Sequence, residues 1–132
     1  MRTILIGFLL ISVMSCKKDL GSTKSEIVGT WEYERYSGFP FNIPALPPGN
    51  GKIIVIGDDG LYERKQQDTL LFRGSYSLNK KKDCHPTNST VTFSTSENPG
   101  SFAYVEISEG KLLLSSSNCN VDGGTSIYIR IK

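Results

Sequence analysis

The side chains that could carry out chemistry are few, and their spacing does not bring them together. His85 is the only histidine, and the three cysteines form no Cys-x-x-Cys pair. Transition-metal sites need such clustered ligands, so we predict no metal site and no cofactor. A serine triad would also have to use His85, and no Gly-x-Ser-x-Gly segment is present. The sequence therefore predicts no catalytic residue and a protein that is not an enzyme.

The N-terminal segment has the proportions of an export signal that ends before Cys16. An apolar run follows Arg2 at residues 4–13, and it is too short for a bilayer core that needs about 20 residues. It fits the apolar region of a secretory signal peptide, here residues 1–15. Val13-Met14-Ser15-Cys16 resembles the bacterial lipobox, whose cysteine is acylated and becomes the first mature residue. An ordinary signal peptide with an incidental cysteine is the alternative.

The lipobox resemblance implies a protein that is anchored to a membrane by acyl chains such as palmitate. Each buried methylene contributes about 0.8 kcal/mol, so several chains would hold the protein firmly without a spanning segment. Residues 16–26 contain Gly21, Ser22 and Thr23 and predict a flexible tether. Cys16-Lys17-Lys18-Asp19 is similar to the start of Bacteroidota-type envelope lipoproteins. That similarity implies the outer membrane of the cell envelope, on its periplasmic face or at the cell surface.

Composition favours one all-β domain over residues 27–132. The 15 basic and 13 acidic residues nearly cancel, and no basic stripe with interleaved aromatics is present, so nucleic acid is not an expected partner. No segment keeps the apolar period of a helix. Alternating segments instead predict about eight strands, at residues 27–36, 52–56, 61–65, 70–78, 90–94, 102–107, 111–115 and 126–132.

Short turns between these segments predict an antiparallel up-and-down β-barrel that closes on its first strand. Asp58-Asp59-Gly60 and Glu109-Gly110 are the clearest turn signals. On the last strand, Ile127, Ile129 and Ile131 alternate with Tyr128 and Arg130. If the isoleucines face inward, Tyr128 and Arg130 must face outward.

Gly29-Thr30-Trp31 on the first strand, with Arg130 on the last, resembles the lipocalin (calycin-type) pattern. In that family, an arginine from the last strand stacks across the tryptophan. The resemblance implies barrel closure by Gly29, Trp31 and Arg130, with the guanidinium within about 6 Å of the indole centre. Asp59-Gly60-Leu61-Tyr62 and Gly74-Ser75-Tyr76 are similar to segments of small lipocalin-like envelope lipoproteins.

Cys84 and Cys119 remain once Cys16 is assigned to the anchor. In an oxidising compartment these two cysteines predict a disulfide, worth about 3–4 kcal/mol in the chain-entropy model; free thiols are the alternative. Strict alternation of strand direction places the two loops at opposite ends, whereas a disulfide needs Cα atoms within about 7 Å. Either the loop after Asn79 climbs the wall, or a strand is miscounted, or the thiols are unpaired.

Two classes of function remain, and they differ in whether the barrel is open. The first is a lipid-anchored carrier or sensor of a small apolar ligand, with a cavity of at least about 300 Å³ lined by Trp31, Phe72, Tyr76 and Phe93. The alternative is an interaction or inhibitor module with a packed barrel, which presents the apolar, proline-stiffened loop at residues 39–46 to an envelope protein partner. The candidate ligand-binding residues are Trp31, Tyr33, Phe39, Phe41, Tyr62, Arg64, Phe72, Tyr76 and Phe93.

Overall fold

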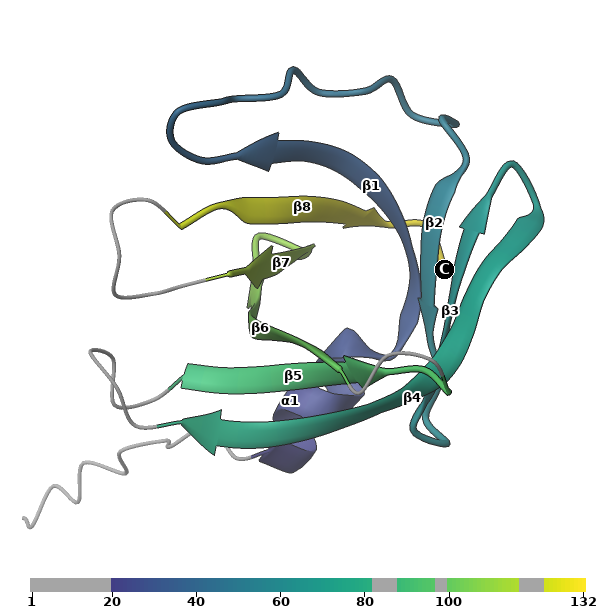
Figure 1. The fold of residues 1–132 in the computed structure, drawn as a ribbon, viewed down its shortest axis with the longest axis vertical. Coiled ribbons are helices and arrows are strands. Elements are labelled where there is room, and N and C mark those ends of the chain that lie inside the picture. The colour runs from purple at the N-terminus through teal and green to yellow at the C-terminus, as the bar shows by residue number, and fades with distance from the viewer. Residues whose placement is uncertain (1–19, 82–87, 97–99, 117–122) are drawn as a thin grey trace, which may run out of the picture.

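Eight strands in chain order form a closed antiparallel barrel in the computed structural model, which describes residues 20–81, 88–96, 100–116 and 123–132. Each strand pairs with the next, and β8 pairs with β1, so no sheet edge is left open. The predicted all-β up-and-down barrel is therefore confirmed (Figure 1). The strands are β1 (Gly29–Ser37), β2 (Lys52–Ile56), β3 (Leu61–Gln66), β4 (Thr69–Lys81), β5 (Asn88–Ser94), β6 (Ser101–Ser108), β7 (Lys111–Ser115) and β8 (Thr125–Arg130).

A short helix, α1 (Leu20–Ile27), precedes β1 and packs against the barrel (Figure 1). Ile27 is fully buried in the core, and the Thr23 hydroxyl lies 3.2 Å from that of Ser89. The flexible tether predicted for residues 16–26 is therefore wrong from Leu20 onward. Glycine and serine are weak helix formers, so the burial of Thr23 and Ile27, which no local pattern reveals, decides the conformation. No helix in the described part of the chain is long and apolar enough to cross a membrane.

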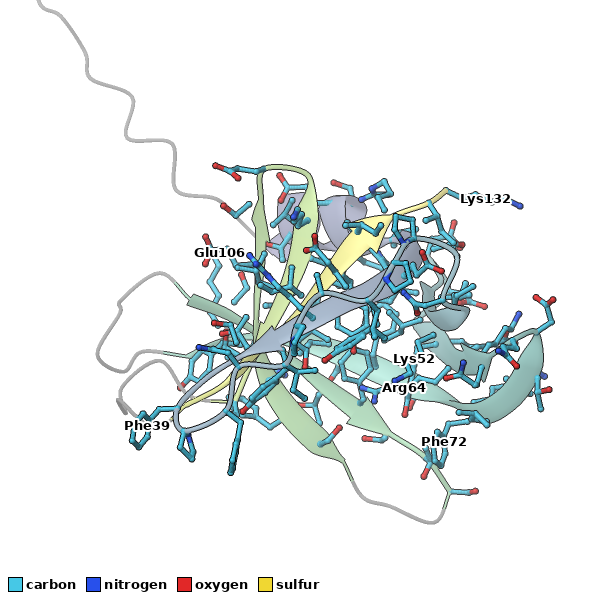
Figure 2. All side chains as sticks on the ribbon, turned by 90° about the horizontal axis from the view of Figure 1, so that it is seen from above. Phe39, Lys52, Arg64, Phe72, Glu106 and Lys132 are labelled. Carbon is cyan, nitrogen blue, oxygen red and sulfur yellow. The ribbon has the colours of Figure 1, made fainter. Side chains whose placement is uncertain are left out.

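The barrel has two different ends. The turns at residues 57–60 and 109–110 lie at the end against which α1 packs, called the α1 end. The connection at residues 38–51, called the long loop, and the β3–β4 turn lie at the opposite end, called the mouth. Figure 2 shows this division, with α1 and Lys132 toward one end and Phe39 and Phe72 toward the other.

The structure brings Gly29, Trp31 and Arg130 together where the barrel closes. The guanidinium carbon of Arg130 lies 4.1 Å from the centre of the fully buried Trp31 ring. Gly29 has φ +152°, and a Cβ there would lie 2.5 Å from Arg130 Nη1, so glycine is needed for the arginine to cross.

The core is one cluster of buried side chains: Ile27, Trp31, Ile54, Ile56, Tyr62, Tyr76, Val91, Phe93, Val105, Leu112, Leu114 and Tyr128.

On β8 the inward face is the opposite of the one expected from the isoleucines. Tyr128 belongs to the core and packs edge-on against Tyr33, with ring centres 5.6 Å apart. Arg130 shares the face of Tyr128 and covers Trp31. The expectation is wrong because Ile127, on the other face, is also buried. Both faces of this strand therefore look apolar, and alternation alone cannot identify the inner one.

The outer side of β8 is covered by an ion pair between its neighbours. β8 lies between β1 and β7, and Lys111 Nζ on β7 donates to Glu34 on β1 at 2.9 and 3.0 Å. The pair therefore reaches across the outer face of β8 near Ile129, the register partner of Lys111.

The predicted signal peptide and Cys16 lie outside the described residues, as do Cys84 and Cys119. Acylation and the disulfide therefore stay predictions.

Candidate ligand site at the barrel mouth

A cavity of about 310 Å³ lies at the mouth, between the long loop and strands β1, β2, β3, β4 and β8. We call it the mouth cavity. Its size is at the lower end of the range for small-molecule sites, about 300–1,000 Å³. Aromatic and aliphatic side chains form most of its wall, and cations and one amide supply the polar groups. The lining residues are Tyr33, Ile43, Leu46, Lys52, Ile53, Ile54, Arg64, Lys65, Gln66, Leu71 and Tyr128.

A second, smaller cavity of about 170 Å³, called the side pocket, is lined by Tyr62, Arg64, Phe72, Phe93, Thr95 and Ser101. Arg64 lines both cavities and so stands between them. A register shift in the β3–β4 pairing leaves Leu71 without a partner. As a result, the consecutive residues Leu71 and Phe72 each reach a cavity, which regular alternation would not allow.

Arg64 faces the interior and has no ion pair among the residues that the structure describes. Its guanidinium carbon lies 5.8 Å from the centre of the Phe93 ring, which is a cation–π contact. Burial raises the pKa of the nearby Tyr128 hydroxyl, and the positive charge of Arg64 opposes that rise. Tyr128 therefore stays protonated at neutral pH and can donate a hydrogen bond.

Lys52 is the second cation at the mouth; it is exposed, and Figure 2 shows it beside Arg64. It alternates with the buried Ile54 and Ile56 on β2, which places it on their face. Its ammonium lies 5.6 Å from the centre of the Tyr33 ring, and the described residues offer it no carboxylate. Burial, and secondarily Tyr36, raises the pKa of the Tyr33 hydroxyl.

The long loop is fixed to β1 by a buried glutamate. Glu32 is 4% exposed, and its carboxylate accepts hydrogen bonds from Gly49 N at 2.8 Å and Gly51 N at 3.1 Å. The Asn50 amide donates to the Tyr33 carbonyl at 2.8 Å, and Leu46 N donates to the carbonyl of Glu34 at 2.8 Å. These bonds hold Leu46 in the wall of the mouth cavity.

The predicted ligand-binding residues line one of the two cavities, pack in the core, or lie exposed outside both cavities. Tyr33 and Arg64 line the mouth cavity, and Tyr62, Arg64, Phe72 and Phe93 line the side pocket. Trp31 and Tyr76 are instead packed in the core, where the Tyr76 hydroxyl donates to the Gly57 carbonyl at 2.6 Å. The sequence predicted a cavity lined in part by Trp31 and Tyr76, but neither residue lines the mouth cavity or the side pocket. Phe39 and Phe41 belong to neither cavity and are 73% and 72% exposed.

Sequence reasoning missed three residues of this region. The segment at residues 52–56 looks apolar on both faces, which hides the inward direction of Lys52, although its alternation with Ile54 and Ile56 was a usable signal. Tyr128 was expected outside because of its isoleucine neighbours. Glu32 sits on the outer face of an alternating strand, where a charged side chain is normally solvated, and nothing local signals its role.

No protein-family model matches the chain, and no curated protein or solved structure is significantly similar to it. Among the described residues, no three His, Cys, Asp or Glu side chains gather in a group that could hold a metal ion.

Proposed function

We propose that the protein is a lipid-anchored envelope lipoprotein whose lipocalin-like barrel binds a small, largely apolar ligand at its mouth. The observation that carries this proposal is the mouth cavity of about 310 Å³, walled by Tyr33, Ile54, Leu46 and Tyr128. Transfer of apolar surface from water into such a site is favourable by about 25 cal/mol per Å². The hydrogen bonds that Glu32 accepts from Gly49 N and Gly51 N fix the long loop before a ligand arrives, which lowers the entropy cost of binding.

A lipid anchor at Cys16 would fit this arrangement, because the chain that follows it enters α1, at the end opposite the mouth. Cys16 precedes Leu20, the first residue of α1, by four positions, a span of at most about 14 Å of extended chain. An acylated Cys16 would therefore hold the α1 end close to the membrane. The mouth would then face away from the membrane, toward the aqueous compartment from which a ligand comes.

The test measures binding of N-phenyl-1-naphthylamine, a neutral dye that fluoresces in apolar surroundings. The protein is the full-length chain with Cys16→Ser, so that neither acyl chain nor detergent competes. We expect saturable binding that Leu46→Asp weakens at least about tenfold, because it places a charge in the cavity wall. Leu61→Asp is the matched control, since Leu61 is exposed at the α1 end. Absence of saturable binding, or equal loss in both variants, would overturn the proposal.

A second candidate function is contact with another envelope protein through residues 39–46. The observation that favours it is the exposure of Phe39 and Phe41 on a loop that is held in place, which is unusual for large aromatic side chains. Combined Phe39→Ser and Phe41→Ser substitutions should abolish cross-linking to the partner in native envelopes, with Phe102→Ser, an exposed residue on β6, as the control. Unchanged cross-linking of the double variant would count against this function.

A further inference from the structure

We propose that the ligand at the mouth carries an anionic head group, a carboxylate or a phosphate ester, held by Arg64 and Lys52. This inference rests on the proposed function, because it assigns the chemical class of the molecule that enters the same cavity.

The first argument is that two of the three cations that line the mouth cavity have no carboxylate partner among the described residues. Lys65, the third of them, pairs with Glu63, and the outer cations Arg73 and Lys111 pair with Glu63 and Glu34. Arg64 and Lys52 have no such partner among the described residues. The linings of the mouth cavity and of the side pocket contain no acidic residue at all. The mouth therefore carries positive charge, on half-buried Arg64 and exposed Lys52, that no carboxylate of the described residues pairs with.

The second argument is energetic. Half-buried Arg64 loses part of its hydration, and the exposed Lys52 at the same cavity adds repulsion because its charge has the same sign. Aromatic faces replace only part of that hydration, at 5.8 Å from Phe93 for Arg64 and at 5.6 Å from Tyr33 for Lys52. A bound anion would offset both costs, so the cavity is electrostatically complete only with an anionic occupant.

The third argument is the fit of the donors and of the space. An arginine guanidinium binds carboxylate and phosphate through two parallel hydrogen bonds, and Gln66 and the protonated Tyr128 line the same cavity as further donors. At about 30 Å³ for each water-sized group, the cavity of about 310 Å³ holds about ten such groups. The ligand is therefore a short amphiphile, with a body of one short chain or one or two rings.

The experiment compares three probes of one shape by displacement of the neutral dye from the full-length Cys16→Ser chain. Octanoate and octyl phosphate are anionic, whereas octanamide is a neutral counterpart of octanoate. We expect octanoate or octyl phosphate to bind at least about tenfold more tightly than octanamide, and we expect salt to weaken only the anions. The tighter of the two anions then identifies the head group.

Variants assign the effect to the two cations. Arg64→Gln should weaken the tighter anion about tenfold to a hundredfold and Lys52→Gln somewhat less, while octanamide should change less than about threefold. Arg64→Lys should restore part of the affinity because it restores the charge. Arg73→Gln is the matched control, since Arg73 lies on the outer face in an ion pair with Glu63.

The outcomes separate this inference from the proposed function. If the dye binds but octanamide competes as well as both anions, the ligand site stands and the anionic head group is refuted. The same conclusion follows if Arg64→Gln leaves anion affinity unchanged. If the dye itself shows no saturable binding, the proposed function fails first.

Discussion

The two ends of the barrel differ in how their inward polar groups are satisfied. At the α1 end, Trp31 Nε1 donates to the Ile27 carbonyl at 2.7 Å, the Tyr76 hydroxyl donates to a backbone carbonyl, and Arg130 donates to the Val28 carbonyl at 2.9 Å. At the mouth, Lys52 and Arg64 contact aromatic rings, and neither forms an ion pair with a carboxylate of the described residues. These inward groups at the α1 end are therefore satisfied by the protein itself, whereas the two cations at the mouth have no carboxylate partner among the described residues.

This difference has a consequence for stability. Inward side chains at the α1 end contribute to folding, and their loss should cost free energy of unfolding. The half-buried charge of Arg64 at the mouth should instead oppose folding, the pattern expected where stability is given up for binding. Substitutions at the two ends should therefore change the free energy of unfolding by different amounts, and in some cases in opposite directions.

The largest effect should come from the centre of the α1 end. Trp31→Ala removes a fully buried indole and leaves a cavity, so we expect a loss of about 3–5 kcal/mol in the free energy of unfolding. Urea denaturation followed by circular dichroism measures it. Phe39→Ala at the mouth removes an exposed ring and should change stability by less than about 0.5 kcal/mol. Similar losses of unfolding free energy in Trp31→Ala and Phe39→Ala would contradict the proposed difference between the α1 end and the mouth.

A smaller loss of stability should follow when a side chain at position 29 takes up the space that Arg130 occupies. Gly29→Ala places a Cβ 2.5 Å from Arg130 Nη1, in a backbone conformation at φ +152° that side chains rarely adopt. We expect a loss of about 2–3 kcal/mol from the combined clash and strain. Gly49→Ala in the long loop also has positive φ, at +84°, but meets nothing within 4 Å, so it should lose only about 1 kcal/mol. The difference between the denaturation midpoints of the two variants gives the cost of the steric clash at Gly29 beyond the cost of backbone strain, which Gly49→Ala measures by itself.

Arg130 at the α1 end and Arg64 at the mouth should differ in how their replacement by leucine changes the free energy of unfolding. Arg130→Leu removes hydrogen bonds to backbone carbonyls and should destabilise the barrel by about 2 kcal/mol. Arg64→Leu removes a partly buried charge without a carboxylate partner, so it should leave stability unchanged or raise it, within about 0.5 kcal/mol. Thermal unfolding of both variants without ligand gives the answer. A loss for Arg64→Leu as large as that for Arg130→Leu would mean that the mouth is not destabilised by its charge.

A loss of stability smaller than those of Trp31→Ala, Gly29→Ala and Arg130→Leu should arise where the long loop is attached. Glu32→Gln leaves one of the two loop amides, Gly49 N or Gly51 N, without its carboxylate acceptor, which should cost about 1 kcal/mol. Hydrogen exchange should then be faster at the Gly51 amide than in the native protein. Glu106→Gln, at an exposed position on β6, is the control and should change neither quantity.

Local patterns were informative wherever one face of a strand is buried and the other solvated. The alternation on β4 and the turn signals at residues 57–60 and 109–110 were enough to predict the strands and their order, and Gly29, Trp31 and Arg130 pointed to the closure. The patterns failed where both faces are covered, as on β8, and where burial overrides weak propensity, as in α1. They also failed at Glu32, whose partners lie 17 and 19 residues further along the chain.

The sequence by itself determined that this chain forms a closed barrel, because strand length, turn chemistry and alternation are local properties that agree with one another along residues 29–130. Only the tertiary structure decided which end is packed and which is open. That depends on the register between strands, which sets Tyr128 opposite Tyr33 and Arg64 opposite Ile54 and Phe72. A register shift of one residue would exchange the faces of a whole strand. The position at the mouth of two cations that have no carboxylate partner among the described residues therefore follows from pairing and not from composition.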